Sequence, residues 1–348
     1  MLALDILKSS KDINNTVVFN CDNPTDREML SNRDIEFLTK LVGQAKIIFI
    51  DEGQKVDTIG QTLKLLVDYY KNEKQVFITG SSSRHLLDGV QESLTGRKYV
   101  YTLFPLSLEE VYPKKNFLKF QKEIEQYLIF GMYPDVINKD SFQEKKEVLR
   151  ELTSSYLYKD IFELESIRNS DVLAKLVKAL ALQIGSEVST NELSRFLGID
   201  KKTVDKYIDL LEKAFVLFRV SPFTRNQRKE ISKSKKIYFY DLGIRNAIIN
   251  NFGFVDSRDD IGMLWENFVM VERMKFRQYN NIDANQYFWR TYYGSEIDLV
   301  EEIGGKLFGY KFKWSAKIKN PRVPALWKEY KDASYTVINK ESLDGFVF

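Results

Sequence analysis

Two short apolar runs, at residues 47–50 and 76–78, limit the folds open to the first part of the chain. A strand with one face in water alternates apolar and polar residues, whereas a strand buried on both faces is apolar almost throughout. Residues 58–72, between the two runs, have the spacing of an amphipathic helix. Strand, helix and strand in this order predict a parallel sheet covered by helices, a fold of the α/β class.

The same alternation extends over about the first 105 residues. Residues 16–20 and 98–102 have the composition of strands, and residues 24–42 have helical spacing. Further strands are predicted at residues 236–241, 286–291, 296–301, 306–313 and 334–338. Because 348 residues exceed what one core usually serves, we expect three domains, at residues 1–105, 106–245 and 246–348.

Composition excludes several classes of protein. No stretch approaches the ~18 apolar residues of a membrane helix, so we expect no membrane partner. Cys21 and His85 are the only residues of their types, which excludes an internal disulfide and a zinc site made of several cysteines or histidines. These features predict a cytoplasmic protein. The net charge of +3 indicates nucleic-acid binding only if the charge is concentrated locally.

Asp51 and Glu52 end the first apolar run, which is the form of a Walker B strand. Parallel strands deliver such residues to the carboxyl edge of the sheet, where α/β proteins bind ligands. Asp51 is then the candidate Mg²⁺ ligand, and Glu52 is the candidate catalytic residue that orients water. A strand followed by a solvated acidic turn is the alternative interpretation.

Thr79 and Ser81 follow the next strand, in a polar turn that could face a nucleotide phosphate. Arg97 precedes residues 98–102 and is a candidate catalytic arginine, acting in cis or across a subunit interface. A surface arginine in a salt bridge explains its position equally well. The phosphate-binding motif GxxxxGK[ST] does not occur in these 348 residues.

The order of motifs resembles a large prokaryotic family of AAA-like P-loop ATPases with a C-terminal domain of unknown function. The resemblance rests on residues 49–55, 78–83, 92–97, 103–107, 131–135, 158–161, 236–243, 264–269 and 296–298. It implies ATP and Mg²⁺ as cofactors. It also implies that the chain begins inside the helix after the phosphate-binding loop, at about residues 2–10, through a late start codon or a degenerate gene. We therefore expect weak or absent ATP binding. Residues 98–102 are then expected either to stand off as a strand with an unpaired edge or, as we favour, to pair beside residues 75–79.

The middle part predicts a winged helix. Ser189 and Glu192 have the spacing of a capping box that opens one helix, and a second amphipathic helix follows a turn at Gly198. Residues 189–236 contain twelve Lys or Arg and six Asp or Glu. The candidate DNA-binding residues are Lys201, Lys202, Arg225, Arg228 and Lys229. The alternative is a packing module between the ATPase and the C-terminal domain.

The last part has the layout of a PD-(D/E)xK nuclease core, an α/β nuclease-like fold. Glu266 on a helix, Asp298 on a strand and Lys313 on the next strand are the candidate site residues. Lys311, however, stands where the second carboxylate belongs, and a cation repels a metal ion. The fold is therefore expected to persist without cleavage, and ordinary surface charge explains Lys311 and Lys313 equally well.

Three functions remain open from the sequence. The first is an ATP-dependent switch that acts on a partner, with a protein partner binding through the C-terminal domain. The second is a DNA-associated binding protein without turnover, and the third is a metal-dependent nuclease.

Overall fold

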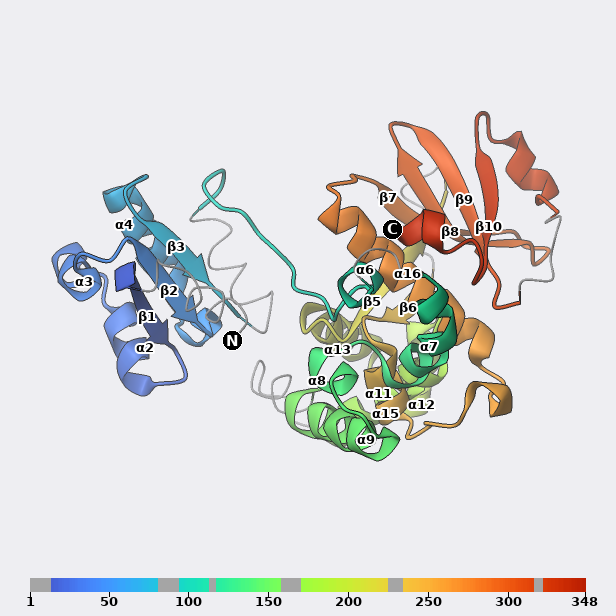
Figure 1. Cartoon of the computed structure of the whole chain (residues 1–348), viewed down its shortest axis with the longest axis horizontal. Helices are drawn as coiled ribbons and strands as arrows, with labels where there is room; N and C mark the ends of the chain where they lie inside the picture. The colour runs from blue at the N-terminus through green and yellow to red at the C-terminus, as the bar shows by residue number, and fades with distance from the viewer. Residues whose placement is uncertain (1–13, 81–93, 113–116, 158–169, 225–233, 316–321) are drawn as a thin grey trace. The chain divides into compact units, whose positions relative to one another are not determined.

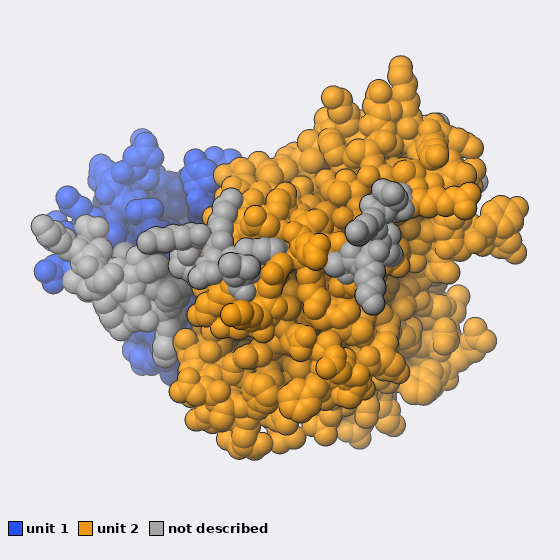
Figure 2. Space-filling view, turned by 45° about the vertical axis from the view of Figure 1, so that its right-hand side comes forward, with its two compact units in different colours: residues 1–102 blue, residues 103–348 orange. Residues whose placement is uncertain are grey.

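The computed structural model describes residues 14–80, 94–112, 117–157, 170–224, 234–315 and 322–348. The chain divides into two compact units, residues 1–102 and 103–348 (Figures 1 and 2). It is a mixed α/β chain, with a three-stranded parallel sheet in the first unit and a seven-stranded sheet in the second. The expected helix at residues 2–10 lies outside the described residues, as do Ser81, Arg225, Arg228 and Lys229.

The first unit is built on strands β1 (Thr16–Asn20), β2 (Ile47–Asp51) and β3 (Gln75–Ile78), in that spatial order. All pairs are parallel, so the three carboxyl ends meet at one edge (Figure 1). Ile48 and Ile50 of β2 are fully buried and pack in one core with the helices. These helices are α2 (Pro24–Ser31), α3 (Ile35–Val42) and α4 (Ile59–Tyr70). The apolar runs therefore form strands, as their composition predicts.

Residues 98–102 do not form the expected strand beside β3; this prediction is wrong. Tyr99 is 90% exposed, Val100 57% and Tyr101 87%, and the segment has no regular structure. Aromatic and β-branched residues favour strands only where a neighbouring surface buries them. Here the segment instead reaches the boundary between the two units, at residue 102.

The second unit contains one sheet, in the order β10-β9-β8-β7-β5-β6-β4. Its strands are β4 (Glu187–Val188), β5 (Leu217–Pro222), β6 (Lys235–Phe239), β7 (Asn285–Arg290), β8 (Glu296–Ile303), β9 (Lys306–Phe312) and β10 (Ser334–Ile338). β5 pairs parallel with β7, which joins strands from the middle and the last part of the sequence. The sheet thus contains strands from residues 106–245 and from residues 246–348. The division of the chain into three domains stays a prediction.

The helices of the second unit differ in length and place. In the middle part they are α6 (Leu108–Val111), α7 (Phe117–Phe130), α8 (Pro134–Ile137), α9 (Phe142–Glu151), α11 (Ser170–Leu182), α12 (Thr190–Leu197), α13 (Lys201–Lys213) and α15 (Leu242–Ile248). A π-helical turn, η3 (Leu152–Leu157), extends α9. The later helices are α16 (Ile261–Tyr279), α17 (Asp344–Val347) and the 3₁₀ turns η4 (Val255–Ser257) and η5 (Ala325–Glu329). Figure 1 shows α8, α9 and α15 at one end of the unit and β8–β10 at the other.

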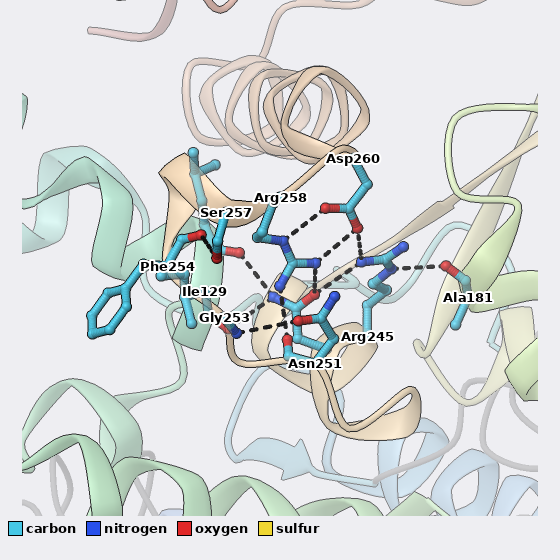
Figure 3. A network of polar contacts seen from close by, with 11 residues as sticks. Ile129, Ala181, Arg245, Asn251, Gly253, Phe254, Ser257, Arg258 and Asp260 are labelled. Carbon is cyan, nitrogen blue, oxygen red and sulfur yellow. Dashed lines mark hydrogen bonds and ion pairs between the residues drawn. The ribbon is translucent and has the colours of Figure 1, made fainter.

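A buried polar network stabilises the helical end (Figure 3). Asp260 accepts hydrogen bonds from Arg245 Nη1 at 2.6 Å and from Arg258 Nε at 2.7 Å. The arginines also donate to backbone carbonyls, Arg245 to Ala181 and Arg258 to Asn251, each at 2.8 Å. Buried charges are tolerated only when they are paired and hydrogen-bonded, and both conditions hold here.

The longest helix, α16, is attached to the sheet by a side-chain amide. Asn267 accepts a hydrogen bond from the backbone N–H of Phe239 at 2.7 Å and donates to the carbonyl of the same residue at 2.8 Å. Because Phe239 is the last residue of β6, this contact fixes the position of α16 along the strand. Glu266, the neighbouring residue, is thereby brought to the sheet.

Among the residues that the structure describes, no helix combines the length and the apolar character that crossing a membrane requires.

Candidate functional site

The carboxyl edge of the first sheet brings together Asp51 and Thr79. The Thr79 hydroxyl donates a hydrogen bond to Asp51 Oδ1 at 2.5 Å. Backbone bonds fix this pair, because Thr79 N–H donates to Ile50 and Gly53 N–H donates to Thr79, both at 2.9 Å. Asp51 and Thr79 are both partly exposed, so the carboxylate is oriented and accessible to solvent.

Glu52 adopts a left-handed backbone, with φ of 53°. A non-glycine residue in this region is uncommon and costs conformational energy. Its carboxylate accepts a hydrogen bond from Gln54 Nε2 at 2.6 Å, and both side chains are partly exposed. The next residue must be small, since a Cβ on Gly53 would lie 2.3 Å from Ile78 Cδ1. A larger residue at position 53 would therefore displace the Ile78 side chain of β3.

Arg97 forms a salt bridge with Asp68 of α4, and about half of each side chain is exposed. Of the other first-unit candidates, Ser81 is outside the described residues.

Cys21 is buried beside this edge, and burial, with Asp26 and Asp51, raises its pKa to about 11. A thiol with so high a pKa is almost entirely protonated at neutral pH and is therefore a poor nucleophile.

The middle part places Lys201 and Lys202 in the first turn of α13, where both are exposed. α13 begins after Asp200, whose side chain accepts a hydrogen bond from Thr203 N–H at 3.0 Å. Ser189 caps α12 in the same way, through Glu192 N–H at 3.3 Å. The lysines therefore lie exposed at the amino end of an amphipathic helix whose other face is buried in the core.

The second unit contains a cluster of charged and phenolic side chains, which we call the lysine–carboxylate cluster. Its members are Lys236 and Tyr238 of β6, Glu266 of α16, Glu296 and Asp298 of β8, and Lys311 of β9. Lys313, expected in this site, is exposed and follows the end of β9. Its place beside Asp298 is taken by Lys311.

Each ammonium of the cluster lies between carboxylates. Lys236 Nζ is 2.9 Å from Glu266 and also pairs with Glu296. Lys311 Nζ is 2.5 Å from Asp298 and 3.9 Å from Glu296. In the described part of the chain, no three Asp, Glu, His or Cys side chains are arranged to hold a metal ion. The ammonium groups of Lys236 and Lys311 instead neutralise the carboxylates that could attract a metal cation.

Asp298 is the most perturbed acid of the cluster. Burial, together with Glu266, raises its pKa to about 7, although Lys311 and Lys236 oppose the shift. At Lys236 burial opposes the charge, but Glu266 and Glu296 reverse the effect and raise the pKa. The cluster therefore carries a carboxyl group that can exchange a proton near neutral pH.

Sequence reasoning did not assign Lys236, Tyr238 or Glu296 to a site. The available signal was the two-residue alternation of strands, which places Lys236 and Tyr238 on one face of β6 and Glu296 and Asp298 on one face of β8. The meeting of β6 with β8 depends on the pairing of β5 with β7, which no local pattern indicates.

Three family models match the chain. Residues 1–112 match an AAA domain, residues 121–254 a domain of unknown function named DUF8612, and residues 261–344 a domain of unknown function named DUF4143.

Similar proteins include uncharacterized proteins of bacteria and archaea. One from Mycobacterium tuberculosis is 26% identical over 297 residues, which are 85% of this chain and 64% of that protein. One from Methanocaldococcus jannaschii is 26% identical over 315 residues, 86% of this chain and 68% of that protein. The chain thus spans slightly less than two thirds of the mycobacterial protein. A crystal structure of a Vibrio cholerae protein, VC1899, covers 96% of both chains at 13% identity, with a TM-score of 0.19.

The AAA match at the amino end and the DUF4143 match at the carboxyl end support an AAA-like family with a C-terminal domain of unknown function.

Proposed function

We propose that this protein is a nucleotide-dependent switch of the AAA-like ATPase family, in which the second unit acts on a partner. The observation that carries the proposal is the hydrogen bond from Thr79 to Asp51 at the carboxyl edge of a parallel sheet. It lies within the residues that match an AAA domain. The edge of a parallel sheet is where α/β proteins bind nucleotides, and an oriented carboxylate there suits a hydrated Mg²⁺.

The described residues fit the metal end of such a site. Mg²⁺ keeps several waters and takes one or two carboxylates together with phosphate oxygens, so Asp51 alone suffices from the protein. Thr79 holds the carboxylate in place by donating to Oδ1, which leaves Oδ2 for water. Glu52, which follows Asp51 directly, would orient the attacking water in such a site. When bound, Mg²⁺-ATP would supply the phosphoryl group and the charge that the switch detects.

The phosphate end is different, because these 348 residues contain no GxxxxGK[ST] loop. That loop supplies the backbone amides and the lysine that hold the β- and γ-phosphates. The 348-residue chain is therefore expected to bind Mg²⁺-ATP weakly, with a dissociation constant on the order of 1 mM. The affinity that remains should depend on the metal and on Asp51.

Fluorescence anisotropy with a labelled ATP analogue tests this proposal. Weak binding should require Mg²⁺ and should fall at least about fivefold in Asp51→Asn, because one charged metal ligand is lost. Asp57→Asn, the same change at an exposed loop position, is the matched control and should bind like the parent. Equal binding by Asp51→Asn and the parent would show that Mg²⁺-ATP does not bind at the Asp51–Thr79 edge. Micromolar affinity would point to a phosphate site elsewhere.

DNA contact through α12 and α13 is a second candidate function. The element order α11, β4, α12, α13, β5, β6 and the antiparallel pairing of β6 with β4 and β5 favour a winged helix. Gly198, with φ of 67°, makes the turn between the two helices. The exposed Lys201 and Lys202 would contact phosphates from α13, and Arg225, Arg228 and Lys229 would do so from the wing.

Duplex DNA binding measured at several salt concentrations tests this second candidate. Each phosphate contact contributes about 0.9 to the slope of log affinity against log salt. Lys201→Ala with Lys202→Ala should therefore reduce the slope by up to about two. Lys175→Ala with Lys178→Ala, on the exposed face of α11, is the matched control. If Lys201→Ala with Lys202→Ala leaves the slope unchanged, these lysines do not contact DNA, and α12 and α13 only pack within the protein.

A further inference from the structure

A cavity of about 430 Å³ opens on the second unit, and none of its lining residues belongs to the lysine–carboxylate cluster. Its lining is mostly aromatic and consists of Trp289, Thr291, Tyr292, Tyr293, Leu326, Glu329 and Tyr330. Ligand pockets in proteins have volumes of about 300–1,000 Å³ and combine apolar walls with a few polar groups. The cavity is therefore large enough for a small ligand or for one long side chain.

One wall of the cavity is fixed by a packed aromatic core. Trp289 is only 5% exposed, and its indole N–H donates a hydrogen bond to the Tyr330 hydroxyl at 3.2 Å. The Trp289 and Tyr330 rings each pack against Trp327, with centroids at 5.5 Å and 5.2 Å. These contacts hold the wall in one arrangement before any ligand arrives, which reduces the entropy cost of binding.

The other wall is a pair of tyrosines in the turn between β7 and β8. Tyr292 is 99% exposed and Tyr293 is 89% exposed, and their rings meet at 86° with centroids 5.7 Å apart. The turn is closed by the Thr291 N–H donating to the Ser295 carbonyl at 2.9 Å, with Gly294 at φ of 85°. Neither tyrosine contributes to the core of this unit, so the fold gives no structural reason for two such large rings at this tip.

The charge of the lining is negative. Among the lining residues, Glu329 is the only one with a charged side chain, and it is exposed. Within the described residues no lysine or arginine pairs with Glu329, and the nearby Arg290 pairs with Glu187 at 3.2 Å. Aromatic ring faces carry negative electrostatic potential and attract cations within about 6 Å. Rings and carboxylate together therefore favour a positively charged ligand and disfavour phosphate.

We propose that this cavity binds an organic cation, an ammonium or guanidinium group, between the aromatic walls and beside Glu329. The apolar rings accept the alkyl part of the ligand, and the ring faces and carboxylate accept its charge. The same chemistry is offered by a free quaternary ammonium compound and by an arginine of a partner. This site is independent of the nucleotide edge of the first unit.

Calorimetric titration of the full chain with choline, with its neutral isostere 3,3-dimethylbutanol and with N-acetyl-arginine amide tests the proposal. Both cations should bind, and the neutral isostere should bind at least about fivefold more weakly, because it keeps the apolar contact and lacks the charge. Tighter binding of choline assigns the site to a free ammonium ligand, and tighter binding of the arginine derivative assigns it to a partner side chain.

Two exposed positions supply variants that leave the fold intact. Tyr292→Leu with Tyr293→Leu keeps apolar volume but removes the ring faces, and should weaken choline binding at least about fivefold. Tyr292→Phe with Tyr293→Phe is the matched control and should retain binding, while Glu329→Gln should weaken it. Equal binding of choline and the neutral isostere overturns the proposal. So does an absence of cation binding, or tighter binding of a thymidine oligonucleotide at the same residues.

Discussion

Asp298 is enclosed by the seven-stranded sheet with both carboxylate oxygens hydrogen-bonded. Oδ1 accepts from Lys311 Nζ at 2.5 Å, and Oδ2 accepts from the Phe312 N–H at 2.7 Å. Only 1% of the residue is exposed. Burial outweighs the pairing, so its pKa lies near 7 rather than at the ordinary value of 3.8. The residue is thus a buried acid whose charge depends on pH in the physiological range.

The stability of the second unit should depend on this proton. Between about pH 4 and pH 7 the native carboxyl retains a proton that the unfolded chain has released. The contribution of Asp298 to the free energy of unfolding is therefore present below about pH 4 and is lost as pH rises through about 7. In Asp298→Asn this loss disappears, so the variant gains stability relative to the parent as pH rises, by at most about 1.4 kcal/mol per pH unit.

Urea denaturation at a series of pH values measures this effect. Tryptophan fluorescence reports the second unit alone, because all four tryptophans lie after residue 102. The constant difference between variant and parent includes altered hydrogen bonds, so the slope against pH is the informative quantity. Parallel curves for the two proteins would show that Asp298 has an ordinary pKa.

At the scale of single residues, the sequence indicated which side chains meet at the Asp51–Thr79 edge, but not which meet in the lysine–carboxylate cluster. Asp51 and Thr79 each end a strand that its own composition identifies, and parallel pairing alone brings them to one edge. Lys236 joins Glu266 and Glu296 only after distant strands have paired, so no local pattern could predict it. Motif spacing indicates Lys313 as the lysine beside Asp298, whereas in the structure Lys311 lies there.

Buried polar contacts add to the hydrophobic core that joins the elements of the second unit. α16 carries Asn267, whose amide satisfies both the N–H and the carbonyl of Phe239 at the end of β6. Asn267 is 1% exposed, so no water replaces these bonds. The helical spacing of α16 predicts that it is a helix, but it does not predict which strand the helix contacts. At residues 98–102 local composition favours a strand, but no described strand pairs with this segment.

Replacing Asn267 with Leu should destabilise the second unit by about 2–6 kcal/mol. Two buried backbone groups of Phe239 lose their partners, and each unsatisfied group costs about 1–3 kcal/mol. Asn280→Leu is the matched control, since Asn280 donates only to Phe276 at the exposed end of the same helix and should cost less than about 1 kcal/mol. Urea denaturation followed by tryptophan fluorescence measures both. Similar stabilities of the two variants would show that Asn267 does not attach α16 to the sheet.

The whole molecule combines two units with separate sheets and separate candidate chemistry. The first carries the Asp51–Thr79 edge and the match to an AAA domain. The second carries the α12–α13 helices, the lysine–carboxylate cluster and the aromatic cavity. In an ATP-dependent switch the first unit would detect the nucleotide, and the second would contact the partner. Nucleotide binding at the Asp51–Thr79 edge is therefore what distinguishes this switch from a binding protein without turnover.

Paramagnetic broadening by Mn²⁺-ATP tests that claim most directly. Mn²⁺ replaces Mg²⁺ at oxygen ligands and broadens the amide signals of nearby residues in a nitrogen–proton NMR spectrum of the full chain. If the nucleotide binds there, the signals of Asp51, Glu52, Thr79 and Gly80 should lose intensity first, and Asp51→Asn should abolish this loss. Broadening centred on Glu266, Glu296 and Asp298, with the first unit unaffected, would contradict it.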